Sequence, residues 1–191
     1  KTTPVTIDGT FKGMQGATMA VAHGPAAYYV NLTPQTKVAV NGAAKADFLG
    51  PKMFVTFTAK VNSQNEIAEP LKTMKMLTPN DVIVAGTQKE SEDGEFSQVY
   101  YAGYITAKKG DNFTLQYGRS AKETVTFQVD EEAEISVELV GNAANARLAR
   151  DGDGVKIFGK AAKQLDMQGP GLALAEDVTI TLAEPLSNAK P

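Results

Sequence analysis

The chain has no cysteine and only one histidine among its 191 residues. Without cysteine it forms no disulfide and carries neither a thiolate nucleophile nor a cysteine-ligated zinc site. The single histidine, His23, cannot form a multi-histidine metal centre, and its place at the end of a predicted strand gives it no evident partners for general acid–base catalysis. These absences exclude several large classes of metalloprotein and thiol enzyme.

Long apolar runs are missing as well. A run such as Val82–Ala85 is far shorter than the roughly 20 residues that a membrane-spanning helix needs. The 19 basic and 22 acidic residues give a net charge of −3, which argues against a dedicated nucleic-acid binder and leaves no polybasic patch for an anionic membrane. Walker, GxSxG and HExxH motifs are also absent, so the sequence predicts no membrane span and no motif-based enzyme.

The sequence does contain an internal repeat. The stretch from Ile7 to Gly24 recurs as Tyr101 to Gly118 after a shift of 94 residues, without a gap. Three glycines and three large apolar positions coincide, which indicates that one β-rich unit is used twice. The matched glycines are Gly9 with Gly103, Gly16 with Gly110, and Gly24 with Gly118.

The repeat continues beyond this stretch with a growing shift. A shift of 97 aligns Tyr28 and Val30 with Val125 and Phe127, and a shift of 100 aligns Val55 with Val155. Near the end, a shift of 107 aligns the pair 68–69 (Ala-Glu) with the pair 175–176 (Ala-Glu). The changes in shift fall where loops are expected, which is where true repeats tolerate insertions.

Alternating apolar and polar residues predict the order β-β-β-α-β-β in each repeat, with Asn41–Leu49 as the first short helix. This is the order of the OB-fold, a five-stranded Greek-key barrel. The sequence therefore predicts an all-β protein of two tandem OB-like barrels, each with one short helix between its third and fourth strands. The first barrel is expected over residues 4–78 and the second over 99–186, joined by a connecting hairpin or linker at 79–98.

Both repeats resemble a family of exported bacterial small β-barrel repeats of unknown function. The resemblance rests on Gly9 after the first strand, on Thr36-Lys37-Val38 and on the stretch from Leu49-Gly50 to Val55, echoed by 133–135 (Ala-Glu-Ile) and 154–155 (Gly-Val). The second repeat lacks the threonine and the regular Leu-Gly spacing. The family brings no known activity with it.

The composition of the sequence resembles that of a periplasmic, cell-surface or secreted bacterial protein. It is rich in threonine, alanine, glycine and valine and begins with Lys1 rather than methionine. An export signal that has been removed is one explanation for this start, and an artificial start point is another.

One short acidic motif resembles the beginning of a calcium-binding loop. Asp151 and Asp153 are spaced as in such a loop, but position 162, where a bidentate glutamate is needed, is alanine. An Asp-Gly turn leading into the fourth strand of the second repeat is therefore the favoured interpretation. We predict no bound metal and no cofactor, with these two aspartates as the weak candidates.

The remaining candidate site is a surface, because OB-folds bind ligands on the outer face of strands two and three and on adjoining loops. In the second repeat two tyrosines on a polar sheet offer contact area for a protein or a sugar. Val82–Ala85 is a second candidate, as an edge strand that recruits a partner by strand addition. The predicted face consists of Tyr100, Tyr104, Thr106, Lys108, Thr114, Gln116, Thr126 and Gln128.

The leading functional hypothesis is a non-enzymatic, exported binding or assembly module that contacts another protein, a larger assembly or a glycan. A single-stranded nucleic-acid-binding OB protein is the first alternative, by analogy of fold alone. A hydrolase that acts through a pair of carboxylates is the second alternative.

Overall fold

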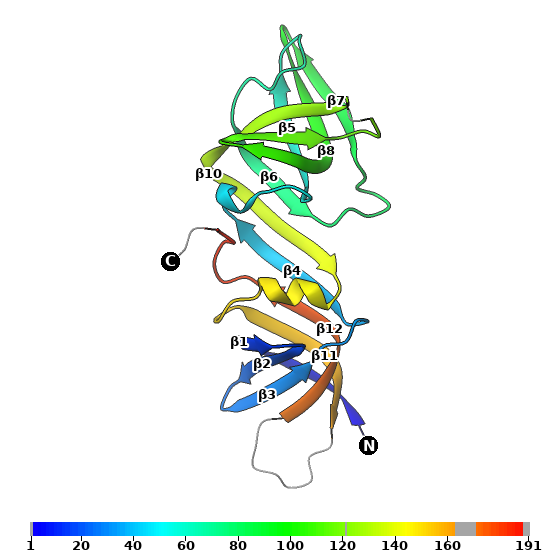
Figure 1. Cartoon of the computed structure of the whole chain (residues 1–191), viewed down its shortest axis with the longest axis vertical. Helices are drawn as coiled ribbons and strands as arrows, with labels where there is room; N and C mark the ends of the chain where they lie inside the picture. The colour runs from blue at the N-terminus through cyan, green and yellow to red at the C-terminus, as the bar shows by residue number, and fades with distance from the viewer. Residues whose placement is uncertain (1, 121, 163–170, 189–191) are drawn as a thin grey trace. The chain divides into compact units, whose positions relative to one another are not determined.

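A computed structural model of the chain describes residues 2–120, 122–162 and 171–188. The described residues form twelve β-strands and two 3₁₀ helices, so the protein is all-β as predicted (Figure 1). The strands form one mixed sheet in the order β11-β1-β2-β3-β12-β4-β10-β6-β5-β8-β7, in which β9 pairs with β8 and β10. The elements are β1 (Thr2–Gln15), β2 (Thr18–His23), β3 (Ala26–Asn31), β4 (Lys37–Ala44), η1 (Ala46–Phe48), β5 (Phe54–Val61), β6 (Leu71–Leu77), β7 (Gly86–Asp93), β8 (Phe96–Lys109), β9 (Asn112–Gln116), β10 (Thr124–Gly141), η2 (Ala143–Leu148), β11 (Gly154–Ala162) and β12 (Gly171–Thr181).

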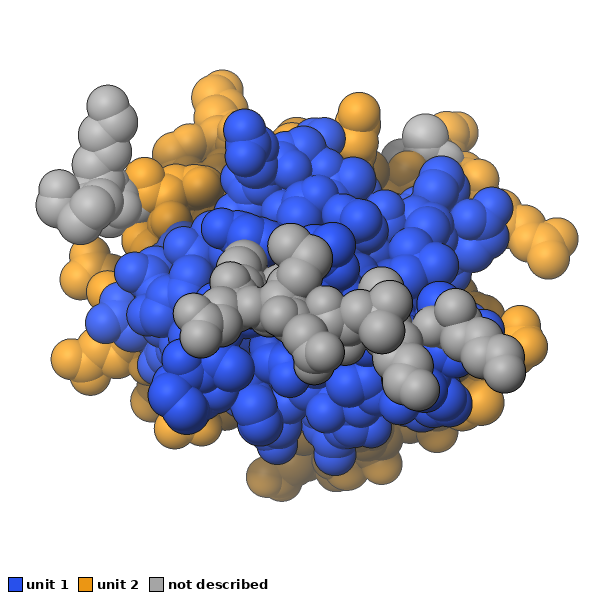
Figure 2. Space-filling view, turned by 90° about the horizontal axis from the view of Figure 1, so that it is seen from below, with its two compact units in different colours: residues 1–42, 138–185 blue, residues 43–137, 186–191 orange. Residues whose placement is uncertain are grey.

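The strands gather into two compact units, coloured separately in Figure 2. Unit 1 comprises Lys1–Gly42 and Glu138–Pro185, and unit 2 comprises Ala43–Val137 and Leu186–Pro191. These units differ from the contiguous barrels predicted over 4–78 and 99–186. Strands β5 and β6 of the N-terminal half lie in unit 2, whereas β11 and β12 of the C-terminal half lie in unit 1, so each unit is built from both halves of the chain.

The strand pairing also shows that each unit combines strands from both halves of the chain. In unit 1, β1 pairs with β11 and places Gly9 opposite Val155; in unit 2, β8 pairs with β5 and places Gly103 opposite Val55. A Cβ atom on either glycine would lie 2.2 Å from a carbonyl oxygen of the next strand, at residue 22 in unit 1 and residue 116 in unit 2. Only glycine allows so close an approach, so both glycines fix how their strands cross. Gly9 and Gly103 therefore hold corresponding positions in the two units, but each glycine lies opposite the valine of the other repeat.

The interior of each unit follows the predicted alternation. Alternation along the fourth strand of each repeat predicts that Phe57 and Ile157 point inward, and these residues, on β5 and β11, are 4% and 0% exposed. Aromatic rings fill much of unit 2: the Phe57 centroid lies 5.5 Å from that of Tyr101 and 4.9 Å from that of Phe127. The Phe127 ring also stacks on Phe113 at 5.3 Å. Burial of these side chains is the main source of stability in a unit of this size.

One ionisable group belongs to this aromatic core, and it makes stability depend on pH. Burial, and to a smaller extent the neighbouring Tyr117, raises the pKa of Tyr101 above its ordinary value. A tyrosine with a raised pKa keeps its proton in the folded state after the unfolded chain has lost it. We therefore expect the free energy of unfolding to fall as the pH rises above about 10, the pKa of a free tyrosine. Urea midpoints measured from pH 8 to pH 11 test this. The midpoint of Tyr101→Phe should fall less steeply with pH than that of the parent, and equal slopes for the two proteins would contradict the role of Tyr101.

The predicted helix over Asn41–Leu49 is wrong in most of its length. Strand β4 runs on to Ala44, and only Ala46–Phe48 forms a single 3₁₀ turn. Tertiary contacts override the helical preference of the alanines here: Asn41 accepts a hydrogen bond from the Leu182 N–H at 2.9 Å, and a Cβ on Gly42 would lie 2.6 Å from the Leu182 Cβ. The second short helix is η2, also 3₁₀, in which the Asn142 side chain accepts the Ala144 N–H. Among the described helices none has the length and apolarity to cross a membrane.

The predicted hairpin at 79–98 is present but shifted along the chain. Strand β7 pairs with β8 around a two-residue turn at Gly94-Glu95, with Gly94 at φ 60°. Val82–Ala85 is not the predicted edge strand but part of a bent segment before β7. Val82 and Val84 are exposed, while Ile83 packs on a small buried cluster.

Candidate functional site

The tyrosine end of the predicted binding face is largely used inside the protein. Tyr100 packs against the small cluster of Phe54, Leu77 and Ala102, on which Ile83 also rests. Tyr104 is 44% exposed, but its ring makes an edge-to-face contact with Phe54 at 5.0 Å between centroids. Tyr100 is therefore half-buried against the cluster that also holds Ile83, whereas Tyr104 packs on Phe54 and stays exposed.

The polar residues farther along β8 also make intramolecular contacts. The Lys108 ammonium donates to the carbonyls of Asp47 and Leu49, each at 3.3 Å, and lies 5.0 Å from the centre of the Phe113 ring. The Thr106 hydroxyl donates to the Thr114 carbonyl at 3.3 Å. These contacts fix η1 and β9 on β8 rather than leaving a free row of donors.

Of the predicted residues on β9 and β10, Thr114 and Gln116 are half-buried and Thr126 and Gln128 are exposed. Strand β10 pairs with β9 so that Thr126 faces Thr114 and Thr124 faces Gln116. The Gln116 amide donates to the Gly118 carbonyl at 3.2 Å, and Gln128 donates to the Asn112 side-chain oxygen at 3.1 Å. Of the eight predicted residues, Thr126 and Gln128 line a pocket.

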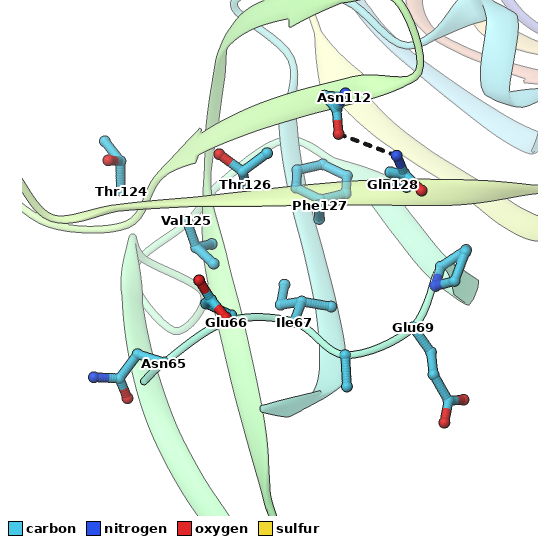
Figure 3. A pocket seen from close by; sticks show the side chains of 12 residues that line it. Asn65, Glu66, Ile67, Glu69, Asn112, Thr124, Val125, Thr126, Phe127 and Gln128 are labelled. Atoms are coloured by element: carbon cyan, nitrogen blue, oxygen red, sulfur yellow. Dashed lines mark hydrogen bonds between the residues drawn. The ribbon is translucent and has the colours of Figure 1, made fainter. Parts of the chain in front are cut away.

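This pocket lies within unit 2, between β10 and the loop at 62–70 that connects β5 to β6 (Figure 3). Its volume is about 500 Å³, within the usual range for ligand sites. In Figure 3 the side chain of Val125 points toward the loop, and Ile67 points from the loop toward β10. The lining residues are Asn65, Glu66, Ile67, Ala68, Glu69, Pro70, Asn112, Thr124, Val125, Thr126, Phe127 and Gln128.

The loop side of the pocket is held in place by its own hydrogen bonds. The Asn62 side-chain oxygen accepts the N–H groups of Gln64 at 3.0 Å and Glu66 at 2.9 Å, an Asx-type turn. The Asn62 N–H donates to the Glu66 carbonyl at 3.0 Å, and the Ala68 N–H donates to the Lys60 carbonyl at 2.9 Å. Because of these bonds the loop stays attached to β5, and the pocket rim is formed before any ligand arrives.

The lining groups define the chemistry of the pocket. Three amide side chains, two threonine hydroxyls and the carboxylates of Glu66 and Glu69 surround an apolar floor of Val125 and Phe127, and no lysine or arginine is among the described lining residues. The two carboxylates do not converge, because Glu66 points toward Val125 and Glu69 points away from β10 (Figure 3). The pocket therefore suits a neutral or cationic ligand that both donates and accepts hydrogen bonds.

The two aspartates considered for calcium have structural partners. Asp153 is buried, and its two carboxylate oxygens accept the N–H groups of Arg150 at 2.7 Å and Ala183 at 2.8 Å. Asp151 accepts the Lys12 ammonium at 3.0 Å. Within the described parts of the chain, no group of three or more histidine, cysteine or acidic residues is placed to hold a metal ion. His23 is exposed and its Nδ1 contacts the Asp8 carbonyl.

Sequence reasoning identified the open strands but missed the loop that completes the pocket. The sequence predicts a polar turn at 62–66 and a fifth strand from about Ile67 to Leu77, so it gives the segment Asn65–Pro70 no part in a site. One signal was available: between the fourth and fifth strands the repeat shift rises from 100 to 107, so the first repeat is seven residues shorter there. A shorter connection leaves less chain to cover β10.

Comparison with known proteins adds no assignment: no family model, curated protein or solved structure matches the chain.

Proposed function

We propose that this protein is a non-enzymatic binding module whose unit 2 pocket holds part of a partner protein. We further propose that each unit is an OB-like barrel, and that the two units arose by duplication and exchanged their last two strands. The resemblance to exported β-barrel repeats implies that the protein acts in the bacterial envelope or outside the cell. The position of the pocket supports the proposal. OB-folds bind ligands between strands two and three and the loop joining strands four and five, and β9, β10 and the loop at 62–70 hold those places in unit 2.

The alternatives fit the pocket less well. A single-stranded nucleic acid needs cationic side chains along its backbone, whereas the charged residues among the described lining are Glu66 and Glu69. A carboxylate-based hydrolase needs two acidic groups directed at one bond, and these two glutamates point in different directions (Figure 3). A neutral glycan satisfies the same hydrogen-bonding groups as a protein segment and is the competing ligand class.

Blocking the pocket should abolish partner binding without unfolding the protein. Glu66 is exposed and its side chain points toward Val125, so Glu66→Trp places a large ring in the pocket (Figure 3). We expect at least a tenfold loss of partner capture from extract of the native source, the scale of about 1.4 kcal/mol in binding free energy. The measurement is quantitative pull-down with tagged protein, beside a thermal melt.

The matched control is Glu95→Trp, an exposed glutamate of unit 2 in the β7–β8 turn and outside the pocket lining. It should capture partner as the parent does. Equal capture by the parent and by Glu66→Trp, with both folded, would remove the pocket from the function of the protein.

A further inference from the structure

In unit 1 the region that corresponds to the unit 2 pocket is occupied by a strand of the chain itself. There the first part of β12 lies between β11 and β3 and pairs with both. Its pairing with β3 is parallel and runs from Gly171 opposite Tyr28 to Leu174 opposite Asn31. Strand β12 is 11 residues long, so it covers β3 before it continues along β4.

Unit 2 has the same strands but not this covering segment. By the repeat shift of 97, the counterpart of Tyr28–Asn31 is Val125–Gln128 on β10; by the shift of 107, the counterpart of 172–177 is 65–70. Strand β6 is only seven residues long and begins at Leu71, after those residues. On one side Val125–Gln128 pairs with β9. Strand β6 also pairs with β10, but it begins only after the loop residues that line the pocket together with Val125–Gln128.

The loop sequence explains why the chain does not cover β10 itself. The Asn62 turn and the bond from Ala68 to Lys60 keep residues 62–68 on β5. Pro70 then has no N–H to donate to a neighbouring strand, which disfavours a continued ladder along β10. The counterpart of Pro70 in unit 1 is Asp177, which pairs with Lys37 inside β12.

We propose that the unit 2 pocket receives an extended peptide segment of the partner, which pairs in parallel with Thr124–Gln128 in the place that Gly171–Leu174 takes in unit 1. An uncovered strand edge presents backbone N–H and C=O groups, and strand addition supplies partners for them. The inference rests on the proposed function and specifies its ligand. Five residues of extended chain, about 17 Å, match the length of this edge.

The filled counterpart also indicates which side chains the peptide carries. Ala173, opposite Val30, is 5% exposed, whereas Leu172 and Leu174 on either side of it are 52% and 45% exposed. In unit 2 the counterpart of Val30 is the larger Phe127, so the inward residue of the peptide is small, alanine or glycine. Gly171 is needed in unit 1 because a Cβ there would lie 2.5 Å from the Tyr28 ring, but Val125 replaces that ring in unit 2. Glu66 disfavours acidic residues in the peptide where it passes the loop, whereas the Glu69 carboxylate lies 3.9 Å from the Lys60 ammonium.

The probe is the first part of the chain's own covering segment, residues 171–175, which includes the residues that pair with β3. It is used as the synthetic peptide acetyl-GLALA-amide, which carries no acidic side chain. We expect it, at millimolar concentration, to shift the amide NMR signals of Val125–Gln128 in the full-length protein and to slow hydrogen exchange at alternate residues there. The amides of Tyr28–Asn31, already covered by β12, serve as the internal control and should not change. A peptide N-methylated at alternate residues keeps the side chains but loses the backbone donors, and should bind at least tenfold more weakly.

The outcomes separate this inference from the proposed function. Pocket-dependent partner capture, lost in Glu66→Trp, together with no response to the peptide would overturn strand addition and leave a glycan or a folded protein surface as the ligand. Equal binding of the parent and N-methylated peptides would also overturn it. If Glu66→Trp keeps full partner capture, the proposed function fails instead, whatever the peptide does.

Discussion

Expressed as separate polypeptides, residues 1–78 and 79–191 should each fail to fold, and together they should form the native protein. The N-terminal piece supplies β1–β4 of unit 1 but lacks β11 and β12, and the C-terminal piece supplies β7–β10 of unit 2 but lacks β5 and β6. Each piece would expose the edges of an incomplete unit and leave its core uncovered, and small domains have only a small free energy of unfolding. Far-UV circular dichroism and denaturant titration of each piece, alone and mixed, measure this.

The matched control is the full-length protein, which is cut by a protease after it has folded. A protease site placed at 79–85, the exposed segment before β7, should yield a nicked protein that stays folded, because the cut crosses no strand pairing. A cooperative unfolding transition in either piece alone would show that each half closes on itself, and the exchange of β5, β6, β11 and β12 between units would then be wrong.

The sequence predicted the class of the fold but not which strands pair, and the reason is physical. Alternation sets which side chains point inward, and Phe57 and Ile157 follow it. It does not choose between two partner strands that present the same pattern. Gly9 faces Val155 in the structure, but a chain that closed on itself would place Val55 there, and the two valines are interchangeable to a glycine on the neighbouring strand. The choice depends on long-range connections, which local preference does not encode.

The candidate site shows the same division between local and long-range information. Thr126 and Gln128 were predicted because alternation along β10 places them outward, and they line the pocket. Tyr100 was predicted by the same rule, yet it packs on a cluster that the segment around Ile83 covers, and nothing local to β8 indicates that cover. The loop side of the pocket was missed because it depends on β6 starting late, a feature visible only when the two repeats are compared.

Phe57→Ala should lower the free energy of unfolding by about 3–5 kcal/mol, the usual cost of removing a buried phenylalanine. Phe57 is 4% exposed, and its ring lies 4.9 Å from that of Phe127, so its loss leaves a cavity beside the floor of the pocket. Phe57 comes from the N-terminal half, whereas Tyr101 and Phe127 come from the C-terminal half, so the contact also joins the exchanged strands. Urea unfolding with an unchanged slope measures the loss.

The neighbouring Thr58→Ala is the matched control for that loss. Thr58 is exposed on the opposite face of β5, where its hydroxyl donates to Glu90 at 3.3 Å, and surface substitutions of this kind usually change stability by about 0.5 kcal/mol or less. A small effect at Phe57 with a large one at Thr58 would mean that β5 is displaced by one residue, since a single-residue slip exchanges the two faces of a strand. A large effect at Phe57 accompanied by loss of partner binding in the still-folded variant would tie the aromatic core to the pocket, because Phe127 serves both.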